Sequence, residues 1–337
     1  MESDGKQSDD ATLDPGDPAV VLRACGAVVG AAVADALGAP FEFGPPGAYR
    51  SRFPVPVLEG LGELVGGGAL GWAPGQFTDD TEMAVCVAES LLACGGFDAD
   101  DQFARFQAWA SGANDVGHLT RDVLDSGRPA GEAATEVLLR RRGRNTAGNG
   151  SLMRAAPGAV FFARRGRAAT MAAGRGLSLV THADPLAQWA VAIQHELVRR
   201  ALVGGDPLAG LADLVAELPE DVAPVYAPLL DPGWAPNAAA PTNGSAMGAL
   251  AQAVWTYRHH ETFEDAVTAV VNLGDDTDSV GAVTGTLAGA VHGLDGIPTR
   301  WATGVHGSVT GPDGQRLRYD HLALASLARR LLGSSSS

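Results

Sequence analysis

Two short acidic segments, far apart in the sequence, each stand directly ahead of an apolar helical pattern. Both combine carboxylates with a hydroxyl: they are Thr78, Asp79 and Asp80 in the first segment and Asp276, Asp278 and Ser279 in the second. Such oxygen ligands are the ones that Mg²⁺ and Mn²⁺ prefer. Neither segment has the His or Cys that zinc prefers, and the offsets do not match an EF-hand loop. The pair of segments therefore predicts a site for magnesium-class ions.

Helix capping is the alternative explanation for each segment. Asp and Thr cap helix N-termini, and acidic side chains favour the positive end of the helix dipole. One N-cap needs only one side chain, however, and adjacent carboxylates repel each other unless a cation lies between them. Two segments of this kind favour metal binding over capping alone.

A glycine-rich turn at 148–154 (Gly-Asn-Gly-Ser-Leu-Met-Arg) runs into another helical pattern. Backbone N–H groups in such a turn, followed by a helix N-terminus, favour an anion such as a phosphate, although a plain turn is the alternative. Arg154 could reach a phosphate or pair with a neighbouring helix. The segment 181–185 (Thr-His-Ala-Asp-Pro) resembles a helix stop followed by an Asp-Pro start, with His182 packed inside or facing solvent.

Helical periodicity covers almost the whole chain from residue 19 onward. The predicted helices are 19–37, 78–94, 99–113, 117–125, 130–142, 150–164, 167–178, 184–203, 207–217, 221–230, 243–258, 262–273, 277–292, 297–304 and 320–332. The Pro- and Gly-rich range 38–76 predicts a long loop, which in a compact domain is typically functional or mobile. Gly26 and Gly30 in the first helix would allow a neighbour to approach closely. Strand signals are nearly absent, so we predict one compact all-α domain.

The ends of the chain differ from this pattern. Residues 1–18 carry six acidic side chains against one lysine, Lys6, and predict a disordered acidic arm ahead of a domain at 19–333, with a frayed tail at 334–337. Lys6 is the only lysine, and this bias, with abundant Ala, Gly and Arg, is typical of GC-rich bacterial genomes.

The charge and the cysteines exclude several classes of protein. The formal charge of −15 argues against nucleic-acid binding. No secretory signal or convincing membrane span is apparent, and the three cysteines, an odd number, suit a core in a reducing compartment better than a disulfide framework. We therefore expect a cytoplasmic protein without a membrane partner. The acidic surface and the lack of an interface motif favour a monomer.

Five motifs together resemble the ADP-ribosylglycohydrolase family. They occur in the family's order at 30–43, 75–81, 148–154, 181–185 and 273–285. Each is modestly specific, and their order over about 250 residues makes the resemblance specific. It implies an orthogonally packed multi-helix bundle with a binuclear Mg²⁺ or Mn²⁺ centre in a central cleft.

The resemblance also assigns roles to individual residues. It implies that the two acidic segments supply the metal ligands, Thr78, Asp79, Asp80, Asp276, Asp278 and Ser279. Asp278 would bridge the ions, and Glu42 matches the family's mobile acidic residue near the metals. The residues implied to contact ADP-ribose are Asn149, Gly150, Ser151, Met153, His182 and Gly274. This chain departs from many relatives at Asp275, where they have glycine, and at Ser279, where threonine is commoner.

The implied reaction is hydrolysis of the glycosidic bond between ADP-ribose and an acceptor on a protein, with an arginine-type N-linkage favoured. Asp79, Asp80 or Glu42 would accept the proton of the attacking water or donate one to the leaving group. Hydrolysis of O-linked (serine-type) or small-molecule ADP-ribosyl compounds is one alternative. A non-catalytic ADP-ribose-binding or immunity protein of the same fold is another, and a structural metalloprotein with two capped helices is a third. The full oxygen-ligand set and Glu42 favour the enzyme.

Overall fold

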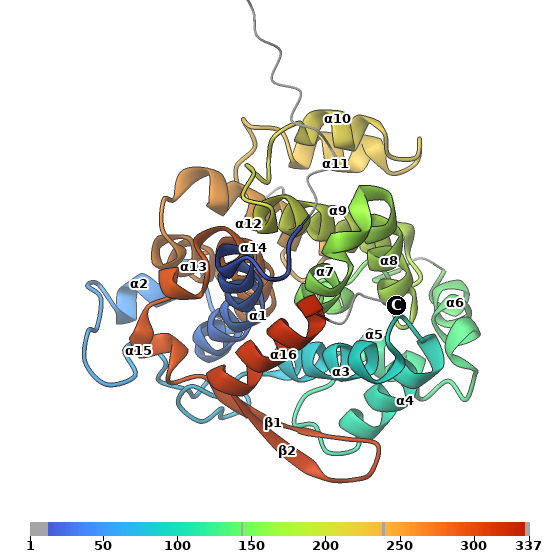
Figure 1. The fold of residues 1–337 in the computed structure, drawn as a ribbon, viewed down its shortest axis with the longest axis horizontal. Helices are drawn as coiled ribbons and strands as arrows, with labels where there is room; N and C mark the ends of the chain where they lie inside the picture. The colour runs from blue at the N-terminus through green and yellow to red at the C-terminus, as the bar shows by residue number, and fades with distance from the viewer. Residues whose placement is uncertain (1–12, 143, 238–239, 334–337) are drawn as a thin grey trace, which may run out of the picture.

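The computed structural model describes residues 13–142, 144–237 and 240–333 (Figure 1). Its α-helices are α1 (Pro18–Gly38), α2 (Ala48–Arg52), α3 (Asp79–Cys94), α4 (Ala99–Ala110), α5 (His118–Leu124), α6 (Ala130–Arg141), α7 (Ala156–Phe162), α8 (Gly166–Leu179), α9 (Pro185–Leu202), α10 (Leu211–Ala216), α11 (Ala223–Leu229), α12 (Ala246–His259), α13 (Phe263–Val271), α14 (Thr277–His292), α15 (Thr299–Ala302) and α16 (His321–Gly333). The 3-10 turns are η1 (Ala39–Phe41), η2 (Asn149–Ser151), η3 (Ala163–Arg165) and η4 (Leu294–Gly296), and the strands are β1 (His306–Thr310) and β2 (Arg316–Asp320). This largely helical structure confirms the predicted all-α class.

Helices α1 and α14 form the centre of the domain and run antiparallel, with backbone against backbone. A Cβ added at Gly285 would lie 2.2 Å from the Gly30 carbonyl oxygen, and one added at Gly289 would lie 2.0 Å from that of Gly26. Only glycine permits this approach, which confirms the close contact predicted for Gly26 and Gly30. The pairing brings the C-terminal end of α1 to the N-terminal end of α14, where the Thr277 hydroxyl donates to the Gly38 carbonyl at 2.9 Å.

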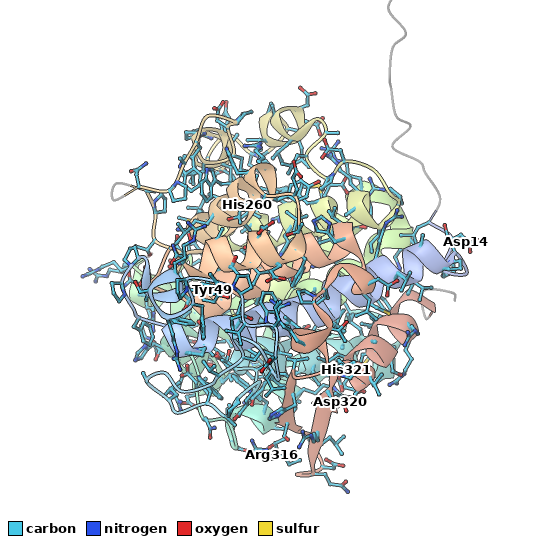
Figure 2. The ribbon with its side chains drawn as sticks, turned by 90° about the vertical axis from the view of Figure 1, so that its left-hand side faces the viewer. Asp14, Tyr49, His260, Arg316, Asp320 and His321 are labelled. Carbon is cyan, nitrogen blue, oxygen red and sulfur yellow. The ribbon has the colours of Figure 1, made fainter. Side chains whose placement is uncertain are left out.

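Further helices surround this pair. Helices α9, α12, α13 and α16 pack against α1 or α14, while α3 and α7 close the side that faces α16. Figure 2 shows α1 crossing the molecule beside α14, with the β1–β2 hairpin and the labelled Arg316 and Asp320 at the lower edge. Helices α10 and α11 form a peripheral pair at the top of Figure 1. The two acidic segments therefore lie at the ends of helices in the core.

The hairpin is the clearest error of the sequence analysis, which expected almost no strand. β1 and β2 pair antiparallel, from His306 opposite Asp320 to Thr310 opposite Arg316. Each strand has only five residues, so the alternation in Arg316–Asp320 is too short to distinguish a strand from a loop. Other differences are shifts of helix ends: the predicted helix 150–164 is η2 followed by α7, and the predicted helix 207–217 shortens to α10.

The first helix is apolar enough to cross a membrane, but it is a core element. The stretch Pro18–Phe41 meets the length and hydropathy of a membrane span, and 83% of its most apolar window is buried inside the protein. Asp17 caps its start by accepting a hydrogen bond from the Ala19 amide at 2.8 Å, and Leu13 is buried ahead of it. Residues 1–12 of the predicted acidic arm and the predicted tail 334–337 lie outside the described residues.

The predicted loop 38–76 contains η1 and α2 but is otherwise irregular, which agrees with its many breakers. Two contacts fix its start beside α14. The Phe43 amide donates to the Asp275 carbonyl at 2.7 Å, and the Asp275 amide donates to the Gly44 carbonyl at 2.9 Å. The loop therefore places Glu42 next to the second acidic segment.

Candidate metal centre

The N-terminus of α3 is held against α1 by one buried carboxylate, that of Asp35. It accepts hydrogen bonds from the amides of Thr78 (3.0 Å) and Thr81 (3.1 Å) and from the Thr81 hydroxyl (2.5 Å). Asp35 is fully buried, so these charge-assisted bonds lie away from water, where they are strong. They fix the position from which Asp79 and Asp80 project.

The second acidic segment opens α14 and meets the first directly. The Ser279 hydroxyl donates to the Asp80 carboxylate at 3.2 Å, although 199 residues separate the two in sequence. The same hydroxyl lies 3.6 Å from the Met153 sulfur. The end of α1 meets the start of α14, and Asp35 near that end holds the start of α3. The structure therefore brings together the two acidic segments, which the sequence related only by their composition.

Glu42 completes the cluster from the loop side. Single carboxylate oxygens of Glu42, Asp276 and Asp278 all lie within 4.8 Å of one another. This spacing is close enough for one ion to contact all three. The structure thus brings the predicted acidic residues of three separate segments together.

Burial makes this cluster electrostatically unfavourable without a cation. Burial, followed by neighbouring carboxylates, raises the pKa of Asp79, Asp80 and Asp278 well above the ordinary value. Burial and the nearby Asp276 likewise raise the pKa of Glu42 to about 8. Carboxylates in such an arrangement must bind protons or cations.

Capping does not account for the cluster. Asp276 occupies the N-cap position of α14, yet its side chain caps no amide of that helix. Thr78 does cap α3, accepting from the Asp80 amide at 3.4 Å, but Asp80 Oδ2 is buried without any hydrogen-bond partner. A buried oxygen in this state requires a partner, and the surrounding carboxylates and hydroxyls fit a hard divalent cation.

The glycine-rich turn lies beside the second acidic segment. The Asn149 side-chain amide donates to Asp276 at 3.0 Å and to the Asn243 carbonyl at 2.8 Å. A Cβ at Gly150 would lie only 3.0 Å from the His182 ring, so the turn needs glycine there to pack against that histidine. The Ser151 hydroxyl bonds instead to Ser178 at 2.8 Å, in the interior.

His182 and Arg154 belong to one buried chain of hydrogen bonds. Arg154 donates to the Thr181 hydroxyl at 2.7 Å, which in turn lies 2.8 Å from His182 Nδ1. Burial, and then the charge of Arg154, lower the pKa of His182 to about 3, so its ring is neutral at physiological pH. Arg154 is buried and its guanidinium also stacks over Phe106, which supports the helix-pairing alternative for this residue.

Three polar residues at this site were missed by the sequence analysis. Asp35 had a recognisable signal, because it is a lone acid within an apolar helix. Asn243 donates to the Gly274 carbonyl at 2.9 Å and accepts from the Asp276 amide at 3.0 Å, but an asparagine in a Pro/Asn/Ala-rich stretch carries no distinctive signal. Asp115, between α4 and α5, is close enough to raise the pKa of Glu42 and Asp79.

Gly274 itself has a positive φ of 79°, and a Cβ there would meet the backbone of Pro45 at 2.7 Å. The glycine allows the loop after η1 to pass close to the start of α14. Asp275, next in the chain, is exposed, so the carboxylate that distinguishes this sequence faces solvent.

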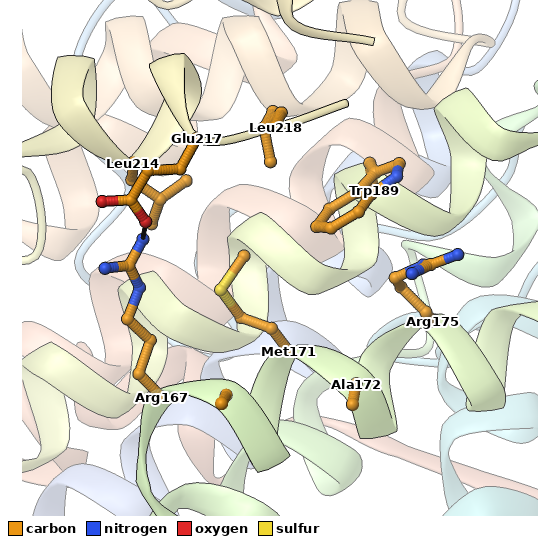
Figure 3. A pocket seen from close by; sticks show the side chains of 9 residues that line it. Arg167, Met171, Ala172, Arg175, Trp189, Leu214, Glu217 and Leu218 are labelled. Atoms are coloured by element: carbon orange, nitrogen blue, oxygen red, sulfur yellow. Dashed lines mark hydrogen bonds and ion pairs between the residues drawn. The ribbon is translucent and has the colours of Figure 1, made fainter. Parts of the chain in front are cut away.

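A separate cleft of about 470 Å³ lies between α8, α9 and α10 (Figure 3). Its lining is mostly apolar, with an Arg167–Glu217 ion pair (2.6 Å) at one end and the Arg175 guanidinium 4.6 Å from the Trp189 ring centre at the other. None of the acidic cluster residues lines this cleft. The chemistry of the cluster is therefore not located there.

Comparison with known proteins decides the family. A sequence model described as ADP-ribosylglycohydrolase matches residues 17–336, nearly the whole chain. The chain belongs to the ADP-ribosylglycohydrolase family. It is 33% identical over 304 residues to "ADP-ribosylarginine hydrolase Tri1" of Pseudomonas putida, with 88% of this chain and 76% of that protein covered. It is 30% identical over 290 residues to "ADP-ribosyl-[dinitrogen reductase] glycohydrolase" of Rhodospirillum rubrum, covering 84% and 90%.

A solved structure supports the same membership. The chain matches one titled "ADP-ribosylglycohydrolase-related protein complex" with a TM-score of 0.74 and 34% identity, over 94% of this chain and 99% of the other. This ADP-ribosylglycohydrolase is therefore a hydrolase of the bond between ADP-ribose and an acceptor, as the resemblance implied. Its acidic cluster has the ligands to hold a metal ion.

Proposed function

We propose that this ADP-ribosylglycohydrolase removes ADP-ribose from modified arginine side chains of proteins and uses two Mg²⁺ or Mn²⁺ ions. The observation that carries the proposal is the convergence of Glu42 and the two acidic segments on one buried cluster. The relatives named as hydrolases of ADP-ribosylarginine and of ADP-ribosyl-[dinitrogen reductase] support the linkage.

In this proposal the residues that would hold the ions are Thr78, Asp79, Asp80, Asp276, Asp278 and Ser279. When bound, the ions would orient the ribose hydroxyls and lower the pKa of a water molecule. The neutral ring of His182 packs on the glycine-rich turn, and Asn149 holds Asp276 in place. We assign the ADP-ribose contacts to Asn149, Gly150, Ser151, Met153, His182 and Gly274.

Glu42 is the proposed proton-transfer group. Its side chain is half-buried on an irregular loop, and burial and Asp276 raise its pKa to about 8. Bound cations would offset the neighbouring carboxylates and lower this pKa, and a half-buried carboxyl on the loop side of the cluster can exchange protons with solvent, as glycoside hydrolysis requires. Asp79 and Asp80 are the alternative groups, but their burial and ligand role make them less free to exchange protons with solvent.

The direct test is release of free ADP-ribose from arginine-linked and serine-linked ADP-ribosyl peptides, with Mg²⁺, Mn²⁺ or EDTA. We expect metal-dependent release from the arginine-linked peptide and loss of that release in Asp278→Ala. Release of ADP-ribose from the serine-linked peptide alone would contradict the arginine linkage and favour O-linked substrates. Binding of ADP-ribose without any release would favour the non-catalytic alternative.

The proposed setting is the cytoplasm of a bacterium, where a monomer would meet its modified protein substrate without nucleic acid or membrane as partner. The acidic charge of −15 supports this setting, as does the burial of the helix that, among the described residues, is long and apolar enough to span a membrane. Sedimentation of the purified protein would test the monomer.

A further inference from the structure

Two exposed side chains, Phe43 and Asp275, stand on strained backbone at the edge of the acidic cluster. Their φ angles are 59° and 66°, in the left-handed region that glycine favours. Positive φ is uncommon for other residues and is an outlier for a bulky aromatic side chain. Phe43 is 70% exposed, so packing in the core does not explain why phenylalanine is there. Strain retained without a packing role points to function.

The backbone places both residues next to groups of the cluster. Phe43 directly follows Glu42, and Asp275 directly precedes Asp276. The Phe43 amide donates to the Asp275 carbonyl at 2.7 Å, so the two residues are paired across the contact between loop and helix start. The two residues therefore adjoin on the backbone at the edge of the candidate metal centre, and both side chains are exposed.

An exposed aromatic ring and an exposed carboxylate at adjoining backbone positions can together receive a planar cation. A guanidinium stacks on aromatic faces and donates paired hydrogen bonds to carboxylates. Among the described residues, no cation–ring contact involves Phe43 and no ion pair involves Asp275. Both side chains are thus available to a ligand.

We propose that Phe43 and Asp275 form an acceptor subsite that binds the guanidinium of a modified arginine. The inference rests on the proposed function. The cluster would hold the ADP-ribose, and the subsite would bind only the arginine side chain that leaves. It would favour an arginine linkage over a serine linkage, which has no cation to recognise. Binding of free ADP-ribose would not depend on it.

Variants that respect the backbone test this subsite. Asparagine tolerates positive φ, so Asp275→Asn removes the charge and keeps the shape, while Asp275→Gly also relieves the strain. Phe43→Leu keeps apolar bulk without the ring, and Phe43→Tyr keeps the ring. The substrates are ADP-ribosylated agmatine, which presents a guanidinium alone, and a serine-linked ADP-ribosyl peptide.

We expect Phe43→Leu and Asp275→Asn each to lower kcat/KM on the agmatine substrate by about 2- to 30-fold, mainly through KM. Phe43→Tyr should retain wild-type kcat/KM. Asp275→Gly should lose activity like Asp275→Asn while its Tm rises, which separates recognition from folding. The dissociation constant of free ADP-ribose, measured by calorimetry, should stay within about twofold of wild type.

The subsite would be overturned if Phe43→Leu and Asp275→Asn had the same kcat/KM as wild type on the agmatine substrate. It would also be overturned if both variants lost affinity for free ADP-ribose by the same factor as they lost kcat/KM. An equal loss on the serine-linked peptide would also overturn it. If wild type itself released no ADP-ribose from the agmatine substrate, the proposed arginine activity would fail and the subsite with it. An active wild type with unaffected variants overturns the subsite alone.

Discussion

Replacing Asp278 with asparagine distinguishes a metal site from a helix cap by the sign of its effect. A carboxylate oxygen of Asp278 lies within 4.8 Å of oxygens of both Asp276 and Glu42. At an effective dielectric constant of about 20, two full charges at that separation repel by about 3.5 kcal/mol. The net repulsion is smaller, because burial and Asp276 raise the pKa of Asp278 and the cluster is partly protonated.

In EDTA we expect Asp278→Asn to be more stable than wild type by about 1–3 kcal/mol. An unfolding entropy of roughly 2 cal/mol/K per residue gives about 0.7 kcal/mol/K for a domain of this size, so Tm should rise by about 2–4 °C. In Mg²⁺ at about 100 times its dissociation constant, wild type should gain about 2.7 kcal/mol, and the variant little.

Scanning calorimetry with EDTA and with Mg²⁺ measures both quantities. Asp278 Oδ1 accepts a hydrogen bond from the Ser279 amide at 3.0 Å, and asparagine keeps that acceptor, so capping is unchanged. The matched control is Asp275→Asn, which removes an exposed carboxylate that acts on the cluster only through its charge near Asp276 and should change both quantities much less. A less stable Asp278→Asn in EDTA, or one with the full Mg²⁺ effect, would refute the electrostatic argument.

Three further predictions concern the elements that build the site. Asp35→Ala leaves two buried amides at the start of α3 without an acceptor. It should lower the free energy of unfolding, measured with denaturant, by about 2–6 kcal/mol and should weaken metal binding. An unchanged denaturation midpoint would contradict the anchoring role of Asp35. Gly285→Val drives a side chain into the Gly30 carbonyl and should prevent folding to a soluble monomer, whereas Gly96→Ala, in open space, should have a wild-type Tm. Burial and a neighbouring carboxylate raise the pKa of Glu42 from 4.5 to about 8. The metal-free protein should therefore lose stability as pH rises through about 8, while its affinity for Mn²⁺ increases. Equal Mn²⁺ affinities at pH 6 and pH 9, measured by titration calorimetry, would exclude this coupling.

The sequence was most informative where function depends on local residue type. Two carboxylates and a hydroxyl ahead of a helix are visible without knowing the fold, so both acidic segments could be identified as candidates for metal binding, and Glu42 followed from the family resemblance. Gly26 and Gly30 could likewise be assigned to close helix packing, because their spacing in an apolar helix is itself the signal.

Residues whose role depends on a distant partner were not assigned that role, even where the residue itself is conspicuous, as the lone acid Asp35 is in its apolar helix. Asp35 binds amides 43 and 46 residues away, and Asn243 links the turn before α12 to the start of α14. The hairpin was missed because it is short and its outer strand is exposed, so its formation depends on packing against the rest of the domain. The strain at Phe43 and Asp275 is visible only in the backbone.

The glycine contact between α1 and α14 also bears on how the chain folds during synthesis. Gly38 and its partner Thr277 are 239 residues apart, so at roughly 5–20 residues per second a ribosome needs about 12–48 s to make the second after the first. Throughout that interval α1, apolar enough to span a membrane, lacks the helix that covers it. Shielding of the nascent chain by a chaperone would therefore matter most for this first helix. The carboxylates of α14 join the cluster last, so the acidic cluster can assemble only after most of the domain has emerged.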